Sequence, residues 1–299
     1  MDPFLIGIDL GGTEVKLGLF TAAGEMLDQR SAPTRDGEIV GGVPAFLFET
    51  RNGLAALLEQ HCAAGQAFRI GVAAPGFVAA DSRSIAHMPG RLKGLQGLDW
   101  ATALGTADAV PLLNDAHAAL LGELWQGAAA GAKNAFMLTL GTGVGGAAVV
   151  DGKLLKGHLG RAGHLGHITL DADGEPDICG TPGSLEDAIG NHNVTARSGF
   201  ETTHALVASV DSGDPQALAH WTRSVHGLAA GIASLINVLD PECVIIGGGI
   251  SNAGETLFAP LRAELDSMEW RPAGHAVRIV PAELGPWAGT YGAAWNVKI

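Results

Sequence analysis

The sequence is poor in features that would each point to a particular class of protein. Only three of its 299 residues are cysteines, Cys62, Cys179 and Cys243, and they lie far apart. An odd and scattered set is no disulfide framework, and it favours a reducing compartment. The 18 Lys and Arg residues form no basic run, and against 31 Asp and Glu they leave a net charge of −13. Because nucleic acid and anionic membranes are bound chiefly through Lys and Arg, we expect neither as a partner.

The sequence also lacks a membrane-spanning or targeting segment. No apolar run reaches the length of a membrane span, and a strand-like segment begins at Phe4 without a basic and apolar leader before it. These absences predict a cytoplasmic protein. At 47% hydrophobic and 16% charged residues, the chain is expected to fold around a large core. An acidic protein can still bind a nucleotide where backbone N–H groups and Mg²⁺ contact the phosphates.

Glycine, in contrast, is abundant, at 44 residues, and much of it lies in turns between strand-like segments. Residues 4–20 (FLIGIDLGGTEVKLGLF) and 134–155 (NAFMLTLGTGVGGAAVVDGKLL) both predict a strand, a Gly/Thr turn and a second strand. Helices and strands alternate after each, so we predict two α/β lobes of similar plan with a cleft between them. The predicted lobes are residues 1–115, with 286–299 as a candidate completion, and residues 116–285.

The first Gly/Thr turn is a candidate phosphate-binding element. Gly11 and Gly12 would let backbone amides point at a phosphate, and Thr13 could add a hydroxyl donor. Asp9, at the end of the preceding strand, could hold Mg²⁺ through water. An ordinary hairpin with an Asx turn explains the same residues equally well.

The second turn, with Gly141, Thr142 and Gly143, contains the spacing G-x-G-x-x-G. A dinucleotide site needs a helix after that motif, but here the β-branched segment AAVVDGKLL follows. We therefore favour a phosphate-binding hairpin over a dinucleotide site. A purely structural glycine turn stays open as a further alternative.

Two more segments could carry chemistry. Asp115 lies in LLNDAH, where a buried strand becomes a helix. The pattern alone favours a helix N-cap for Asp115, and the functional alternative is a general base with Asn114 as a neighbouring hydrogen-bonding group. Gly248 and Gly249 in IIGGGIS either form a tight turn or let a flat purine and ribose lie against bare backbone.

Taken in order, these motifs resemble the ROK family of sugar kinases and their relatives. The resemblance runs from end to end of the chain, and it depends on the ordered set because each motif alone is weak. The matching segments are DLGGT (9–13), APG (74–76), ND (114–115), LGTG (140–143), GH (166–167), CG (179–180), GSLE (183–186), IGGG (246–249) and GTYGAA (289–294). The resemblance implies a two-lobed α/β fold of the actin-like ATPase (ribonuclease H-like) type. It also implies a homodimer.

The resemblance further implies phosphorylation of a hexose or hexose derivative by Mg-ATP. Asp115 matches the base that removes a proton from a sugar hydroxyl, which by analogy is the 6-hydroxyl, as that oxygen attacks the γ-phosphate. The implied ATP contacts are Asp9, Gly11, Gly12 and Thr13 at one phosphate element, Gly141, Thr142 and Gly143 at the other, and Gly248 and Gly249 at the adenosine. The implied sugar contacts are Gly76, Asn114, His164, His167 and Glu186.

Residues 163–186 (GHLGHITLDADGEPDICGTPGSLE) depart from the family pattern. Zinc-bearing members have G-E-x-G-H and then C-x-C-G-x-x-G-C-x-E, whose His and three Cys hold a structural zinc. Here His167 and Cys179 are kept, whereas Asp177 and Ser184 stand at the other two ligand positions. Structural zinc prefers four Cys or His ligands, so the sequence disfavours it, with His167, Cys179 and Asp177 as the remaining candidates. We predict instead a loop held by hydrogen bonds among Asp177, Ser184 and His167.

Two sugar contacts of the family are also changed. His164 replaces the Glu of G-E-x-G-H, although a solvated loop residue would explain it too, and residues 85–94 lack the family's sugar-binding Asn. The sequence therefore does not identify the sugar. The main alternative is a sugar-binding protein of this fold without efficient kinase activity, against which the catalytic residue types Asp9, Thr13, Asp115 and Thr142 argue. A repressor of the family would carry a DNA-binding domain before the first strand, and an oxidoreductase would need a helix after Gly146.

Overall fold

The computed structural model describes residues 2–62, 66–88 and 90–298. The predicted lobe ends at residues 1 and 299, and Pro89 of the 85–94 segment, lie outside these ranges. The chain forms two compact units. Unit 1 contains Met1–Gly131, Lys156–Arg161 and Glu283–Ile299, and unit 2 contains Ala132–Leu155 and Ala162–Ala282.

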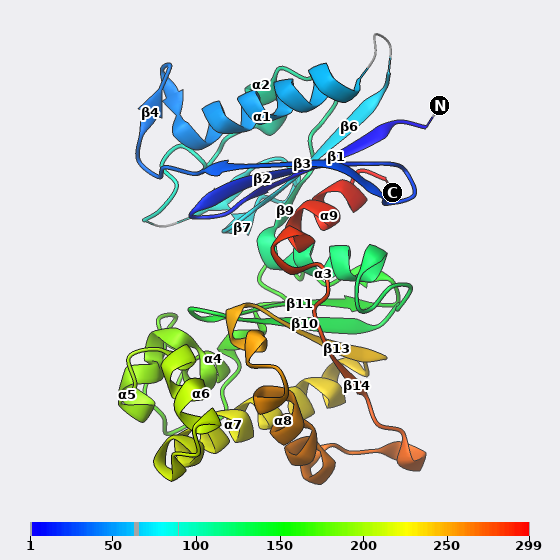
Figure 1. The fold of residues 1–299 in the computed structure, drawn as a ribbon. Helices are drawn as coiled ribbons and strands as arrows, with labels where there is room; N and C mark the ends of the chain where they lie inside the picture. The colour runs from blue at the N-terminus through cyan, green and yellow to red at the C-terminus, as the bar shows by residue number, and fades with distance from the viewer. Residues whose placement is uncertain (1, 63–65, 89, 299) are drawn as a thin grey trace. The chain divides into compact units, whose positions relative to one another are not determined.

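Unit 1 is built on a five-stranded sheet of order β3-β2-β1-β6-β9 (Figure 1). Strand β1 pairs antiparallel with β2 and parallel with β6, and β6 pairs parallel with β9. The strands are β1 (Phe4–Leu10), β2 (Glu14–Phe20), β3 (Met26–Pro33), β6 (Phe68–Ala74) and β9 (Leu112–Asn114). Two short hairpins, β4 (Ile39–Val40) with β5 (Val43–Pro44) and β7 (Phe77–Val78) with β8 (Ile85–His87), complete the strands of this unit.

Helices cover both faces of this sheet, and the alternation of side chains along β1 decides what each face presents. Ile6, Ile8 and Leu10 pack in one core with α1 (Ala45–His61) and α2 (Trp100–Leu104). Gly7 and Asp9 point to the other face, where a side chain at Gly7 would collide with the backbone of α9 (Ala288–Trp295). The sequence therefore places Asp9 beside the closing helix.

Helix α3 (Asp115–Gln126) packs against α9 at close range. A Cβ at Gly122 would collide with the Ala288 carbonyl, and one at Gly292 with the Ala118 carbonyl. Because this contact holds α3 in unit 1, the unit continues to Gly131, beyond the predicted lobe end at Asp115.

Unit 2 repeats the topology with a five-stranded sheet of order β12-β11-β10-β13-β14. The β10–β11 and β11–β12 pairs are antiparallel, whereas β10–β13 and β13–β14 are parallel. The strands are β10 (Ala135–Leu140), β11 (Val144–Val150), β12 (Lys153–Leu154), β13 (Cys243–Gly247) and β14 (Arg278–Pro281). Both predicted strand–turn–strand units are thus present, each opening a sheet of the same plan.

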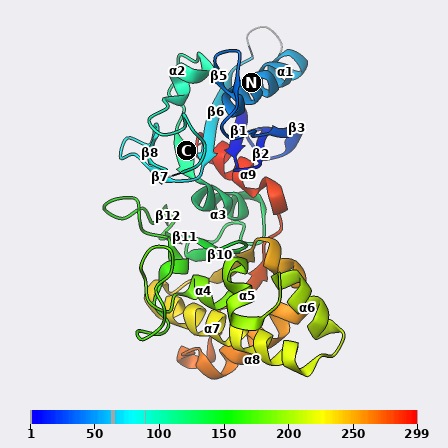
Figure 2. The ribbon, with the colours of Figure 1, turned by 90° about the vertical axis from the view of Figure 1, so that its left-hand side faces the viewer.

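The longest helix of unit 2 shows how its sequence determines its bounds. Helix α7 (Pro215–Leu239) starts after Asp214, whose carboxylate accepts from Gln216 N, with Pro215 at the first position. It ends at Asp240 in the left-handed conformation. Its apolar face, with Val225, Leu228 and Ile232, is buried in the core, and α7 and α8 (Glu255–Met268) lie side by side on one face of the sheet (Figures 1 and 2).

The remaining helices of unit 2 are short. They are η1 (Leu165–His167), α4 (Leu185–Ile189), η2 (Asn191–Asn193), α5 (Val194–Ser198), α6 (Thr203–Asp211), η3 (Gly249–Ala253) and η4 (Pro272–Gly274), and η5 (Gly285–Trp287) precedes α9 in unit 1. Among the described residues, no helix combines the length and the hydropathy that crossing a membrane requires.

Candidate active site

The first Gly/Thr turn is a rigid hairpin with unused backbone donors. Gly11 N–H donates to the Glu14 carbonyl at 2.8 Å, which closes the turn between β1 and β2. The buried Thr34 supports it, because its hydroxyl donates to the Gly11 carbonyl and its N–H to the Thr13 carbonyl, both at 2.8 Å. Among the described residues nothing accepts from the N–H groups of Gly12 and Thr13. Two adjacent amides of this kind suit a phosphate oxygen.

The second turn has the same form in unit 2. Gly141 N–H donates to the Gly143 carbonyl at 2.9 Å, and the described part of the chain offers no acceptor to the N–H groups of Thr142 and Gly143. The buried Glu186 accepts from Val144 N at 2.8 Å, and a Cβ at Gly143 would collide with the Glu186 carboxylate. A side chain at 143 would displace the Glu186 carboxylate, so the predicted sugar contact Glu186 lies directly against this turn.

A histidine that the sequence analysis missed also supports the second turn. His192 donates to the Thr142 carbonyl through its backbone N–H at 2.8 Å and through Nδ1 at 2.9 Å, and its Nε2 lies 2.8 Å from Asp187 Oδ1. Burial opposes the charged imidazole, but the bonds to Asp187 and Thr142 outweigh it and raise the pKa of His192. The sequence gives no clear signal for this role of His192. Asn191 and His192 are two polar residues shortly after GSLE, and they belong to no periodic pattern.

Beside this turn, unit 2 contains a cavity of about 590 Å³, within the size range of small-molecule sites. Its apolar lining comes from Val207 and Ala208 of α6 and from Ile250 and Ala253 of η3. The remaining lining residues are Gly141, Thr142, Asn191, Thr202, Thr203, His204, Asp211, Gly249 and Asn252. A flat base fits such apolar walls, and the polar residues can bind a ribose and phosphates.

The triple-glycine segment divides its roles between its residues. Gly248 has φ +86°, and a Cβ there would collide with the Leu140 carbonyl, so this glycine makes the turn possible. Gly249 lines the cavity, and a Cβ there would meet no atom within 4 Å. Of the two predicted adenosine contacts, Gly249 is thus the one that faces the cavity.

In unit 1 the structure brings Gly76, Asn114 and Asp115 together at the ends of β6 and β9. Asn114 is the N-cap of α3, since its Oδ1 accepts from Ala116 N at 3.0 Å and from His117 N at 3.4 Å, so the N-cap alternative for Asp115 is wrong. Asn114 Nδ2 donates to the Gly76 carbonyl at 3.3 Å. Asp115 is the first helical residue, and its side chain is exposed. An exposed carboxylate here can reach a bound substrate.

Asp9 is the electrostatic partner of Asp115. Burial and the negative charge of Asp115 raise the pKa of Asp9 to about 7, with Lys16 acting in the opposite direction. The Asp9 carboxylate lies against Gly289 at the start of α9, and it accepts no hydrogen bond from any described residue. A carboxylate without protein donors beside a second carboxylate fits a hydrated Mg²⁺, which prefers oxygen ligands and keeps several waters.

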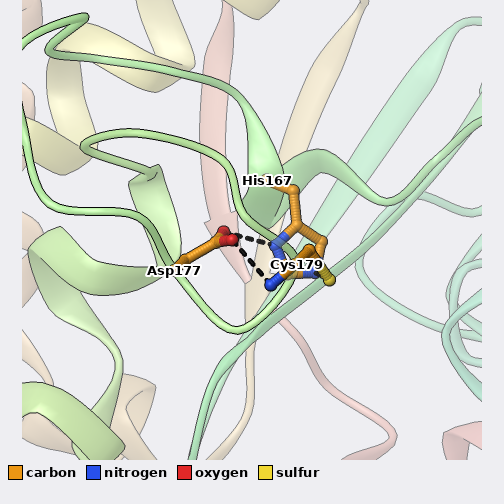
Figure 3. Close-up of side chains that lie close together, drawn as sticks. All are labelled: His167, Asp177 and Cys179. Carbon is orange, nitrogen blue, oxygen red and sulfur yellow. Dashed lines mark hydrogen bonds and ion pairs between the residues drawn. The ribbon is translucent and has the colours of Figure 1, made fainter.

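The loop at residues 163–186 is held by Asp177 (Figure 3). Its carboxylate contacts His167 Nδ1 at 2.7 Å and accepts from the N–H groups of Cys179 at 2.8 Å and Thr181 at 2.9 Å. Burial opposes the charge, but these bonds and one from Ser184 lower the pKa of Asp177 to about 2. Of the hydrogen bonds predicted among Asp177, Ser184 and His167, the one between Asp177 and His167 is present, and Ser184 contributes to the lowered pKa of Asp177.

These residues fit a structural zinc poorly. His167, Asp177 and Cys179 offer ligand atoms within 4.8 Å of one another, and His167 Nε2 lies 3.6 Å from Cys179 Sγ. Both Asp177 oxygens are already bonded to the loop, and Ser184 caps α4 by accepting from Asp187 N. One thiol and a neutral hydroxyl do not replace the thiolates that structural zinc prefers. His164 lies directly before η1, at its N-cap position.

Two units of this topology, each with a Gly/Thr hairpin turn at the end of its first strand, are the arrangement of the actin-like ATPase fold. A model of the ROK family matches residues 5–299. The chain is 33% identical to a glucokinase of Halalkalibacterium halodurans over 99% of this chain and 96% of that protein. It is 32% identical to an N-acetylmannosamine kinase of Escherichia coli O157:H7 over 97% of this chain and 96% of that protein.

Solved structures agree with these matches. The ROK hexokinase from Thermus thermophilus is 30% identical and superposes with a TM-score of 0.80 over 99% of each chain. A ROK family glucokinase from Streptomyces griseus, solved with glucose and AMPPNP, is 26% identical with a TM-score of 0.73 over 98% of each chain. The chain belongs to the ROK family, and it is an ATP-dependent sugar kinase.

Proposed function

We propose that this protein transfers the γ-phosphoryl group of Mg-ATP to the 6-hydroxyl of a hexose or hexose derivative, with Asp115 as the general base. The observation that carries the proposal is the position of Asp115. Its exposed carboxylate is on the first residue of α3, directly after strand β9, and its charge contributes to the raised pKa of Asp9. Phosphoryl transfer needs one carboxylate near the attacking hydroxyl and donors for the phosphate oxygens.

The proposed roles follow from what each side chain can reach. The N–H groups of Gly12 and Thr13, and of Thr142 and Gly143, would bind phosphate oxygens. The cavity beside Gly249 would bind the adenosine. Mg²⁺, when bound near Asp9, would neutralise phosphate charge. Asp115 would take the proton of the sugar hydroxyl as its oxygen attacks phosphorus.

The sugar contacts belong to the same proposal. Asn114 and Gly76 would bind sugar hydroxyls beside Asp115, and His164, His167 and Glu186 are proposed for the same task on unit 2. A neutral imidazole has one donor and one acceptor where the family's carboxylate has two acceptor oxygens. His164 is therefore expected to alter which hexose or N-acetyl hexose is preferred. The homodimer stays a prediction, which sedimentation would test.

The test is ADP release from Mg-ATP across a panel of hexoses, amino sugars and N-acetyl sugars. Asp115→Asn should reduce kcat by about 10²- to 10⁴-fold, the usual contribution of a general base. Glu59→Gln, which neutralises an exposed carboxylate on α1, is the matched control and should leave the rate unchanged. The 6-deoxy analogue of the best sugar should not be phosphorylated.

Two results would contradict the proposal. If Asp115→Asn retained the wild-type kcat, Asp115 would not be the base. If the wild type turned over no sugar faster than Asp115→Asn does, yet bound a sugar of the panel in calorimetry, the protein would be a sugar-binding relative without efficient kinase activity.

A further inference from the structure

Arg91 lies on the first phosphate turn, although the two are far apart in the sequence. A Cβ added to Gly12 would collide with Arg91 Nη2 and would lie 3.1 Å from Cζ and 3.8 Å from Nε. The flat guanidinium therefore covers the bare backbone of Gly12. Gly12 N–H is also one of the two amides of this turn that have no acceptor among the described residues.

The backbone next to Arg91 is fixed by its neighbour Leu92. The Leu92 side chain is buried in the core of unit 1, and its N–H donates to Asp36 Oδ2 at 2.9 Å. Leu92 has φ +53°, a conformation that residues with a side chain seldom adopt, and its carbonyl accepts from Leu95 N at 3.0 Å. This anchor directs the exposed Arg91 side chain toward the turn.

The Arg91 guanidinium has no ion-pair partner in the part of the chain that the structure describes. No carboxylate within residues 2–62, 66–88 and 90–298 forms an ion pair with it, whereas Arg30, Arg35 and Arg83 in the same unit each pair with one. An arginine without a carboxylate, resting on a turn with free amides, is suited to an anionic ligand. Guanidinium binds phosphate oxygens through two parallel donors and stays charged at every working pH.

We propose that Arg91 binds the γ-phosphate of ATP at the Gly11–Thr13 turn and stabilises its negative charge during transfer. The inference rests on the proposed kinase function and adds a catalytic residue to it. Arg91 Nη2 and Nε would donate to phosphate oxygens that also accept from Gly12 and Thr13 N–H. A cation is useful here because Asp9 and Asp115, two neighbouring carboxylates of the same unit, would repel a phosphate.

The test compares Arg91→Ala, Arg91→Lys and Lys93→Ala in steady-state kinetics with the best sugar of the panel. Lys93 is an exposed cation two residues away, so its removal changes the net charge equally. Arg91→Ala should lower kcat/KM for ATP by about 10- to 100-fold, the range of a charge-assisted hydrogen bond, with the sugar KM within about twofold. Arg91→Lys should restore part of the loss, because it keeps the charge and loses the paired donors. Lys93→Ala should match the wild type.

Binding measurements separate this inference from the proposed function. By calorimetry, Arg91→Ala should weaken AMPPNP binding about tenfold or more and leave ADP binding unchanged, since only AMPPNP has the third phosphate. This readout works even if no sugar is phosphorylated, in which case the proposed function fails and the Arg91 contact is still tested. Equal AMPPNP affinity in variant and wild type would overturn the inference. A rise in the sugar KM alone would also overturn it, because Arg91 would then bind the sugar.

Discussion

Replacing Asp9 by Asn is expected to stabilise the folded protein above neutral pH while it abolishes phosphoryl transfer. Burial and the charge of Asp115 raise the pKa of Asp9 from 3.8 to about 7. The folded carboxyl therefore keeps its proton between about pH 4 and 7, where the unfolded one has released it. Since the folded state binds more protons in that window, the free energy of unfolding falls as pH rises through it.

The size of the effect follows from the shift. A rise from 3.8 to about 7 is about three units, and at about 1.4 kcal/mol per unit it gives roughly 4 kcal/mol. This is an upper limit because the residue is only partly buried by accessible surface, so water still solvates some of the charge. The Asn variant avoids that cost. We expect the free energy of unfolding of the Asn variant to exceed that of the wild type by about 2 to 4 kcal/mol near pH 8 and by little near pH 4.

The assay is urea unfolding of wild type and Asp9→Asn at a series of pH values from about 4 to 8. Asp115→Asn is the informative third variant, since removing the neighbouring charge should lower the pKa of Asp9 and recover part of the cost. An Asp9→Asn variant less stable than wild type at pH 8, or a difference independent of pH, would refute the reasoning. Mg-ATP should stabilise the wild type more than Asp9→Asn, because the Asn variant lacks the ionised carboxylate that would hold the cation.

Two further variants remove a carboxylate that accepts several hydrogen bonds, Asp177 in unit 2 and Glu123 in unit 1. Asp177→Asn should destabilise the protein by about 2 kcal/mol at pH 7 and by less near pH 3. The lowered pKa means that the ionised Asp177 stabilises the fold above about pH 4. That contribution is lost as pH falls toward 2. EDTA should leave the wild-type urea midpoint unchanged, and a lower midpoint would point to a metal. Glu123→Gln should cost about 2 to 4 kcal/mol, because both buried oxygens accept backbone N–H bonds, from Ala128 and from residues 283 and 284. Glu59→Gln is the exposed control. Equal unfolding curves for Glu123→Gln and Glu59→Gln would contradict a stabilising role of the buried Glu123 carboxylate.

Local patterns were enough to predict the elements that each unit is built on. The alternation of Val15, Leu17 and Leu19 indicated the second strand, and the apolar stripe from Val225 onward indicated α7, because both are short-range consequences of which face is buried. The end of the first unit was missed for a long-range reason. Helix α3 belongs to unit 1 through its contact with α9, and the glycines that permit this contact give no periodic signal.

The sequence offered candidate site residues only where they form a contiguous motif. Both Gly/Thr turns and the Asn114–Asp115 pair could be recognised from neighbouring residues. The cavity lining from α6, the support of Thr142 by His192 and the contact of Arg91 with Gly12 each depend on residues brought together by the fold. Those partners are ordinary polar residues in loops or at helix ends, so no local pattern distinguishes them from solvated surface.

The two Gly/Thr turns share a backbone form but differ in the residues that support them, and this difference separates their expected responses to pH. Thr34 supports the first turn through two neutral hydrogen bonds, which do not titrate. Glu186 and the His192–Asp187 pair support the second, so its supports are ionisable. The raised pKa of His192 means that its charged form holds the Thr142 carbonyl most firmly at low pH, and this contribution is lost as pH rises through that raised value. At the first turn the titrating group is instead Asp9, whose ionisation would strengthen the binding of a cation as pH rises. We therefore expect cation binding at the first turn to strengthen as pH rises through about 7, and the support of the second turn to weaken as pH rises through the raised pKa of His192.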